Sequence, residues 1–109
     1  MFLPCKENAI VKLSKINDYL LSENHPVGRS KAKFFKMIGF NETNIDLFGK
    51  ALLEISKLEV IETVKNDFGT KYVIIGMLKS PLNIEYLVST VWMLENQSNE
   101  PYLVTCYPK

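Results

Sequence analysis

The hydrophobic pattern of the chain changes near residue 59. Before that point, apolar residues recur every three or four positions, as they do on one face of a helix. After it, apolar and polar residues alternate or form short apolar runs separated by turn residues, which is typical of strands. Helices followed by strands joined through short loops predict the α+β fold class.

Three helical segments are expected in the first half. One covers roughly residues 15–22 and has Ser14 as its cap. The next begins with Ser30 as its cap and ends at Gly39, because glycine suits the left-handed position that follows a helix. A further helix begins at Thr43 or Asn44 and carries the clearest apolar stripe in the chain. This stripe is expected to cover a sheet, and it consists of Ile45, Phe48, Leu52 and Ile55.

Four strands are expected in the second half, over residues 60–64, 71–78, 86–94 and 102–107. Turn residues lie between them, so the strands should pair as an antiparallel meander. The second strand is almost entirely apolar and should be buried on both faces, with Gly76 marking a bulge or a close backbone contact. The predicted architecture is two to three N-terminal helices packed on this four-stranded sheet.

Length and composition fit one α+β domain over residues 1–109. The chain has 109 residues, of which 47% are hydrophobic, and no apolar run is long enough to span a bilayer. The polar start does not resemble a signal peptide, so a cytoplasmic location is expected. One histidine and the distant cysteines Cys5 and Cys106 are poor material for a zinc site, and a reducing cytoplasm disfavours a disulfide between them. No metal or other cofactor is expected.

Charge is unevenly distributed although the net charge is only +1. Residues 1–40 carry seven basic and three acidic side chains, whereas residues 41–109 carry six basic and nine acidic ones. An anionic partner would therefore prefer the N-terminal half. The polarity is mild, which argues against tight non-specific binding to long nucleic acid.

The segment from His25 to Phe35 combines the only histidine and the only arginine with a Pro/Gly turn and the start of a helix. Helix N-termini attract anions, and Arg29 and Lys31 add positive charge at the same end. This combination indicates a phosphate-binding corner. An equally simple interpretation is a joint in which one helix ends at His25 and the next begins at Ser30.

A second group of candidates lies on the last two strands. If strand register brings them together, Thr90, Trp92, Thr105 and Tyr107 form a patch of hydroxyl and aromatic side chains near Lys71. The alternative for each is structural: threonine and tyrosine are ordinary strand formers, a lone tryptophan is usually a core anchor, and a lysine beside a turn is usually solvated.

These residue types fit RNA cleavage through the 2′-hydroxyl, which needs a base, an acid and positive charge at the phosphate. Because histidine side chains in general titrate near neutral pH, His25 is the candidate base or acid, and a lysine, a tyrosine or a carboxylate would be the second proton carrier. The catalytic candidates are His25, Lys31, Lys71, Thr90 and Thr105. The substrate-binding candidates are Arg29, Trp92 and Tyr107, with the two aromatic rings available for base stacking.

The segments HPxGxxKAxFF, from His25 to Phe35, and LVTxYP, from Leu103 to Pro108, resemble a bacterial domain family of unknown function. That family occurs as free-standing proteins and at the C-terminal ends of polymorphic toxins. The order of elements is also similar, more distantly, to the ribonuclease superfold of barnase, RelE-like toxins and colicin ribonucleases. This resemblance implies a toxin-like ribonuclease that uses the catalytic positions named above.

Three functions remain open from the sequence. The first is a metal-independent, toxin-like ribonuclease, a hydrolase that binds RNA and has a cognate inhibitor. The second is a non-enzymatic protein-binding module, such as an immunity or accessory protein, which the near-neutral charge and single histidine favour. The third is a small-molecule enzyme that uses His25 as a base. A homodimer is compatible with an exposed sheet edge.

Overall fold

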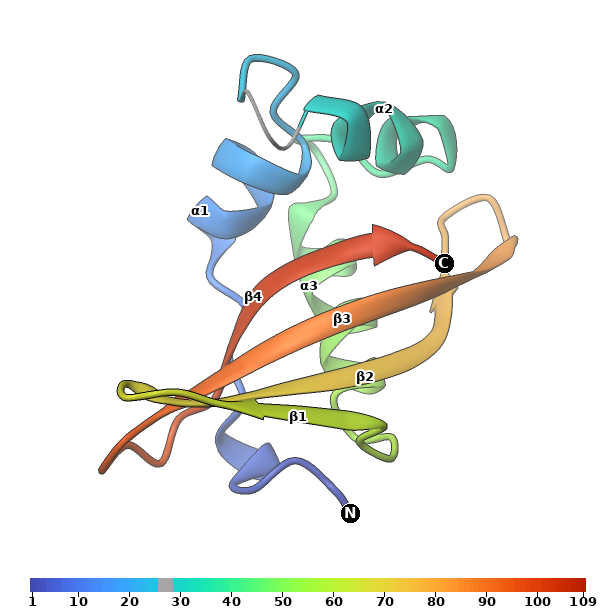
Figure 1. Ribbon diagram of the computed structural model, residues 1–109. Helices are drawn as coiled ribbons and strands as arrows, with labels where there is room; N and C mark the ends of the chain where they lie inside the picture. The colour runs from blue at the N-terminus through green and yellow to red at the C-terminus, as the bar shows by residue number, and fades with distance from the viewer. Residues whose placement is uncertain (26–28) are drawn as a thin grey trace.

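The computed structural model describes residues 1–25 and 29–109 of the chain, and it confirms the α+β class. Short helical segments and two longer helices precede four strands (Figure 1). The helical elements are η1 (Lys6–Asn8), α1 (Leu13–Lys15), the π-helical turn η2 (Ile16–Leu20), α2 (Arg29–Met37) and α3 (Ile45–Ile55). The strands are β1 (Glu62–Lys65), β2 (Gly69–Lys79), β3 (Glu85–Glu95) and β4 (Tyr102–Pro108).

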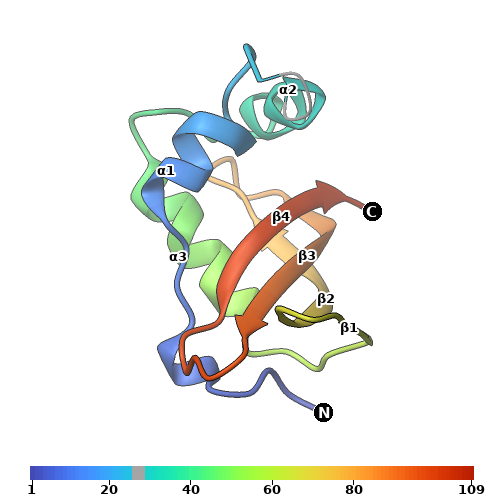
Figure 2. The same cartoon turned by 60° about the vertical axis from the view of Figure 1, so that its left-hand side comes forward.

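The sheet is the predicted antiparallel meander, with strand order β1-β2-β3-β4. Turn chemistry at the β1–β2 hairpin follows the sequence: Asn66 N–H donates to the Gly69 carbonyl oxygen, and the Asn66 side chain accepts from the Phe68 and Gly69 amides. Helix α3 lies across one face of the sheet, and no helix of the described residues crosses the other face (Figures 1 and 2). We call these the covered face and the open face.

The core lies between the covered face and the helices. Trp92 is its largest fully buried side chain, and Ile74, Leu78, Leu103 and Cys106 belong to the same buried cluster on the other strands. Helix α3 contributes the apolar stripe predicted for it, since Phe48, Leu52 and Ile55 are all buried. Burial of this stripe is the main force that holds α3 on the sheet.

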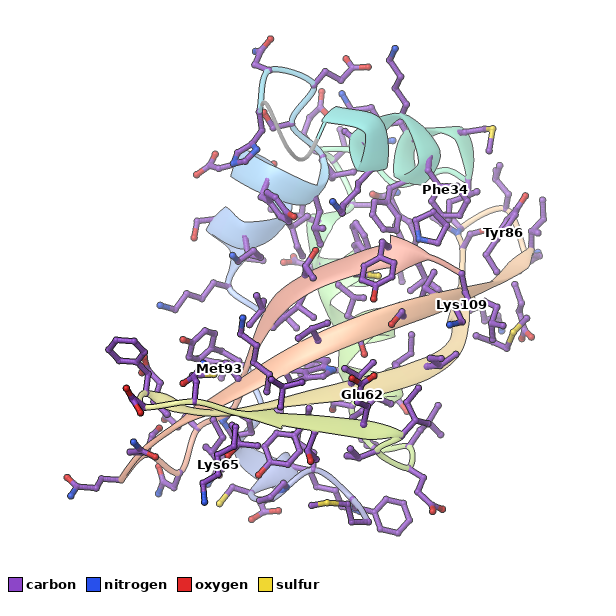
Figure 3. The ribbon with its side chains drawn as sticks, in the orientation of Figure 1. Phe34, Glu62, Lys65, Tyr86, Met93 and Lys109 are labelled. Atoms are coloured by element: carbon purple, nitrogen blue, oxygen red, sulfur yellow. The ribbon has the colours of Figure 1, made fainter. Side chains whose placement is uncertain are left out.

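Helix α2 packs over the N-terminal end of β3. The Phe34 ring meets the Tyr86 ring edge to face at 5.4 Å between centroids (Figure 3). Phe35 is fully buried and contacts the Phe48 ring on α3. Gly39 ends this part of the chain with a φ of 109°, as predicted. These contacts hold α2 at the end of the sheet where β4 also finishes.

The predicted N-caps at two serines are wrong. Ser14 lies inside α1, whose N-cap position is Lys12, and Ser30 is the second residue of α2. Both helices begin earlier than expected because N-cap preference is a weak signal beside tertiary packing. Asn44 does precede α3, but its side chain bonds the Gly39 carbonyl oxygen and the Asn41 amide instead of capping the helix.

The prediction that β2 is buried on both faces is also wrong. Its buried residues alternate with half-buried or exposed ones, so only the covered face is enclosed. Strand β1 begins at Glu62, later than expected, and its four residues are all exposed. Gly76 does mark a close approach, because a Cβ there would lie 2.7 Å from the Leu58 side chain.

The ends of the chain and its cysteines complete the picture. Ile10 forms a parallel bridge to Tyr102, which places the N-terminal segment beside β4. Cys5 and Cys106 are both free thiols. Among the described residues, no helix is long and apolar enough to cross a membrane.

Candidate functional site

A compact group of polar and aromatic side chains lies where η2, the start of α2 and β4 meet. It consists of Lys15, Tyr19, His25, Lys31 and Thr105, and we call it the Tyr19 cluster. In both views α1, α2 and the C-terminal part of β4 lie toward the same end of the molecule (Figures 1 and 2). The Tyr19 hydroxyl lies 3.2 Å from Thr105 Oγ1, within hydrogen-bond distance, which joins residues 86 positions apart in the chain.

Tyr19 is the centre of this group. Its ring meets the His25 ring edge to face, with centroids 4.9 Å apart and planes at 83°. The Lys15 and Lys31 ammonium nitrogens lie 5.2 and 5.5 Å from the centroid of the same ring. Such distances allow cation–π attraction, so one aromatic ring holds the imidazole and two cations around it.

Local structure explains why these side chains converge. Lys15 and Tyr19 are four residues apart on one helical face, so they are neighbours on the helix surface. Ile16 and Leu20 on the same segment are fully buried and fix its orientation against the core. Lys31 reaches the cluster from the first turns of α2.

The charge of Lys31 also acts on β4. Burial raises the pKa of the Cys106 thiol far above its ordinary range, and the positive charge of Lys31 opposes part of that effect. Neither Lys15 nor Lys31 forms an ion pair with an acidic residue in the described part of the chain. The cluster is therefore positively charged and suited to an anionic ligand.

A β-bulge shifts the register of β4 against β3, so the two threonines that the sequence analysis placed together do not share a face. In the β3–β4 register, Thr90 pairs with Cys106 and Val91 pairs with Thr105, and the register shifts between Val91 and Trp92. Paired residues share a face, so Thr90 points to the covered face and Thr105 to the open face. The predicted patch of Thr90, Trp92, Thr105 and Tyr107 is not formed.

Thr90 and Trp92 are fully buried. The Thr90 hydroxyl donates to the Ile74 carbonyl oxygen at 2.7 Å and accepts from Trp92 Nε1–H at 2.8 Å. Side chains enclosed in this way do not reach a molecule outside the fold. In this structure they satisfy each other in the core, which matches the structural alternative stated for the tryptophan.

Two other candidates lie on the open face. Tyr107 is 39% exposed and pairs with Ser89. Lys71 pairs with Met93, and Val73, two residues further along β2, lies in one row with Val91 and Thr105. From strand spacing and rise, the Cα atoms of Lys71 and Thr105 lie roughly 12 Å apart on the same face. Lys71 is thus outside the Tyr19 cluster.

Some predictions fall outside the described part of the chain. The Pro/Gly turn lies at residues 26–28, and the Arg29 side chain is likewise not described. His25 itself is half-buried beside Tyr19. Within the described residues, no group of histidine, cysteine and carboxylate side chains is arranged to hold a metal ion.

Tyr19 was not among the candidates from the sequence. It nevertheless contacts three of the predicted site residues: His25, Lys31 and Thr105. The signal that could have found it is its type, since a tyrosine on an apolar helical face brings a hydroxyl to the boundary of the core.

Comparisons with known proteins define first the fold and then the family. The structure is similar to a chain of a contact-dependent growth inhibition toxin–immunity protein complex from Klebsiella pneumoniae 342, with a TM-score of 0.75. The likeness covers 96% of this chain and 97% of the other, at 12% sequence identity, and therefore concerns the fold. No curated protein sequence matches at a significant level.

The chain belongs to the family described as domain of unknown function DUF6883, whose model matches residues 2–109. This confirms that the chain belongs to a family of unknown function, as the resemblance implied.

Proposed function

We propose that this protein is a metal-independent, toxin-like ribonuclease that cleaves RNA through the 2′-hydroxyl at the Tyr19 cluster. The observation that carries the proposal is the convergence of His25, Lys31 and Thr105 on one tyrosine. These residues come from a bend, a helix and a strand, and three of the five catalytic candidates are thereby brought together. A histidine beside lysines without a described ion pair supplies one proton carrier and the positive charge that such a reaction needs.

The reaction is an internal transesterification. A base removes the proton of the 2′-hydroxyl, the 2′-oxygen attacks phosphorus, and the bond from phosphorus to the 5′-oxygen breaks. An acid protonates the leaving 5′-oxygen, so the products are a 2′,3′-cyclic phosphate and a 5′-hydroxyl. His25 serves as base or acid, and the Tyr19 hydroxyl or the Lys31 ammonium of the same cluster carries the other proton.

Charge and hydrogen bonding support the phosphate in this scheme. The Lys15 and Lys31 ammonium groups stabilise the negative charge that develops on the phosphorane. Thr105 Oγ1 offers a hydrogen bond at the edge of the open face. Arg29 would add charge at the start of α2. Thr90 and Trp92 enter the proposal only as the core that supports β3 and β4.

The open face would carry the flanking RNA. Tyr107 is exposed there and is available to stack a base, and Lys71 lies further along the same face to meet a backbone phosphate. The two residues lie on opposite sides of the Thr105 row, so a strand bound across the Tyr19 cluster would reach Tyr107 in one direction along β3 and Lys71 in the other. RNA is thus the proposed substrate and these two residues its binding surface.

The fold likeness supports a toxin-like role, because the neighbouring chain comes from a toxin–immunity protein complex. The same assembly contains an immunity protein, so the likeness is also compatible with the alternative of a protein-binding module. The Tyr19 cluster favours the enzyme. In either case a cognate protein partner is expected.

The test is RNA cleavage by purified protein in the presence of EDTA. We expect wild-type protein to leave 2′,3′-cyclic phosphate ends, and His25→Ala to lower the rate by about 10²–10⁴-fold. Lys31→Met should lower it strongly, whereas Lys33→Met is the matched control, because Lys33 is an exposed lysine of the same helix outside the cluster. Circular dichroism confirms that each variant is folded.

Two results would contradict the proposal. Cleavage that His25→Ala does not diminish would assign the activity to other residues. Absence of cleavage by the wild type would leave the protein-binding alternative, which a stoichiometric partner in native purification would support. Growth arrest on expression of wild type but not of His25→Ala is an independent indication of the enzyme.

A further inference from the structure

Strand β2 is longer than the strand that covers its outer edge. Strand β1 pairs only with residues 70–73, whereas β2 continues to Lys79. Figure 1 shows β2 running on past the start of β1. The second half of β2 is therefore a sheet edge, although β2 is an inner strand over its first half.

The phase of the hydrogen bonds shows which backbone groups lie on that edge. Asn96 N–H donates to the Phe68 carbonyl oxygen and Ser80 N–H to the Ile84 carbonyl oxygen, so even-numbered residues of β2 face β3. The N–H and C=O groups of Ile75, Met77 and Lys79 point the other way. No described group of the protein bonds them. They form a ladder of three residues ready to accept a strand.

A hollow runs beside this ladder. Its volume is about 480 Å³, and it lies between the β2 edge and helix α3. Leu47 and Ala51 line it from the helix, Met77 from the strand and Pro81 from the following turn. Leu47 is 47% and Met77 48% exposed, so both offer apolar surface at the hollow. The hollow can receive apolar side chains from a strand on the ladder.

The rim of the hollow is positively charged. Lys50 and Lys79 both line it, and neither forms an ion pair with a described acidic residue. Glu54 also lines it, but its carboxylate is bound by Lys57 at 3.1 Å. A second copy of the chain would bring the same two lysines against these, so the charges disfavour self-pairing and favour an acidic occupant.

We infer that this edge is a docking groove for an extended segment of a partner protein that carries alternating apolar and acidic residues. The segment adds to β2 as a strand beside Ile75, Met77 and Lys79. Its apolar side chains fill the hollow on the α3 side, and its acidic side chains, which alternate to the open face, meet Lys79, while Lys50 adds positive charge at the rim. Backbone bonds supply affinity in this mode and the hollow supplies specificity. The inference does not depend on the ribonuclease proposal, because the groove contains no residue of the Tyr19 cluster.

The probe is a nine-residue peptide of alternating valine and glutamate, blocked at both ends and labelled with a fluorophore. A peptide of alternating valine and lysine is its charge-reversed control. Fluorescence anisotropy should show saturable binding of the glutamate peptide to wild-type protein and at least about tenfold weaker binding of the lysine peptide. Failure of the glutamate peptide to bind overturns the inference.

The variant Met77→Pro tests the contribution of the backbone ladder to binding separately from that of the hollow. Proline removes the outward N–H of Met77 but no bond to β3, so this edge should tolerate it. It should weaken binding of the glutamate peptide at least about tenfold, whereas the control Met77→Val, which keeps the N–H, should stay within about twofold. Equal binding by both variants would contradict strand addition.

Two further measurements keep the test decisive if Met77→Pro unfolds. The double variant Lys50→Glu/Lys79→Glu should reverse the preference between the two peptides. In amide exchange, the glutamate peptide should slow the amides of Ile75, Met77 and Lys79 more than their even-numbered neighbours. If the peptide slows exchange at other amides instead, or if sedimentation shows a dimer that uses this edge, the edge has an occupant other than the proposed partner segment.

Discussion

Thr90 and Thr105 lie on neighbouring strands, and the hydroxyl of each lies within hydrogen-bond distance of an aromatic side chain. Thr90 accepts from Trp92, and the Thr105 hydroxyl lies next to that of Tyr19. One pair is fully buried on the covered face, and the other is half-buried beside two lysines and a histidine. The same residue type therefore contributes to stability in one place and to a candidate site in the other.

The difference lies in what each hydroxyl has left to offer. Thr90 already donates to the Ile74 carbonyl oxygen and accepts from Trp92, and it has no exposed surface. Thr105 has one described partner and sits at the edge of the open face. A buried, saturated hydroxyl holds strands together, whereas a half-buried one can exchange its partner for a ligand.

The largest expected effect is on the covered face. Trp92→Ala should lower the free energy of unfolding by about 3–5 kcal/mol, because it empties the centre of the core. Tyr107→Ala on the open face is the control and should cost less than about 1 kcal/mol. Urea denaturation followed by circular dichroism measures both. Similar losses for the two variants would remove the distinction between the faces.

Cysteine reactivity sharpens the same comparison. Cys106 pairs with Thr90 on the covered face, and its burial raises the pKa of the thiol, so the reactive thiolate is scarce. Iodoacetamide at pH 8 should modify the half-buried Cys5 at least about a hundredfold faster. Mass spectrometry of native and urea-unfolded protein measures the two rates, and rapid native modification of Cys106 would show that the covered face opens.

The raised pKa of the Cys106 thiol also determines how the stability of the protein changes with pH. Because its pKa is raised in the folded state, Cys106 keeps its proton where the unfolded chain loses it. Its contribution to stability is complete below the unfolded thiol pKa of about 8.5 and declines as pH rises above it. Cys106→Ala should remove this alkaline part of the stability profile.

Thr90→Val tests the buried hydroxyl alone. The variant leaves Trp92 Nε1–H without its partner inside the core, which should cost about 1–3 kcal/mol of unfolding free energy. Thr105→Val should cost less than about 1 kcal/mol, since its hydroxyl is half-buried and water can replace it. Denaturant titrations of both variants measure these losses of unfolding free energy. A larger loss for Thr105→Val than for Thr90→Val would contradict the assignment of faces.

Local signals explain why most of the fold could be predicted. The apolar stripe of α3, the turn from Asn66 to Gly69 and the helix end at Gly39 each depend on a few adjacent residues. The closeness of His25 and Lys31 also follows from their short separation in the chain. Such features need no knowledge of the tertiary structure.

The features that could not be predicted from the sequence depend on contacts between residues far apart in the chain. The bulge between Val91 and Trp92 reverses which β4 residues share a face, and no local pattern marks it. The partnership of Tyr19 with Thr105 depends on how η2 docks beside β4. The sequence thus identified His25, Lys31 and Thr105 as site residues. It did not identify Tyr19, the residue that all three contact.

The smallest expected effect tests Tyr19 directly. Tyr19→Phe keeps the ring that holds His25, Lys15 and Lys31 but removes the hydroxyl beside Thr105, so stability should fall by less than about 1 kcal/mol. Combined with Thr105→Val in a double-mutant cycle, the two losses should not add, because both remove the same contact, and the coupling should be about 0.5–1 kcal/mol. If the hydroxyl also carries a proton in cleavage, Tyr19→Phe should slow the reaction far more than Thr105→Val while their stabilities stay equal. Full additivity in stability would mean that the two hydroxyls do not interact, and the Tyr19 cluster would then lose its link to the sheet.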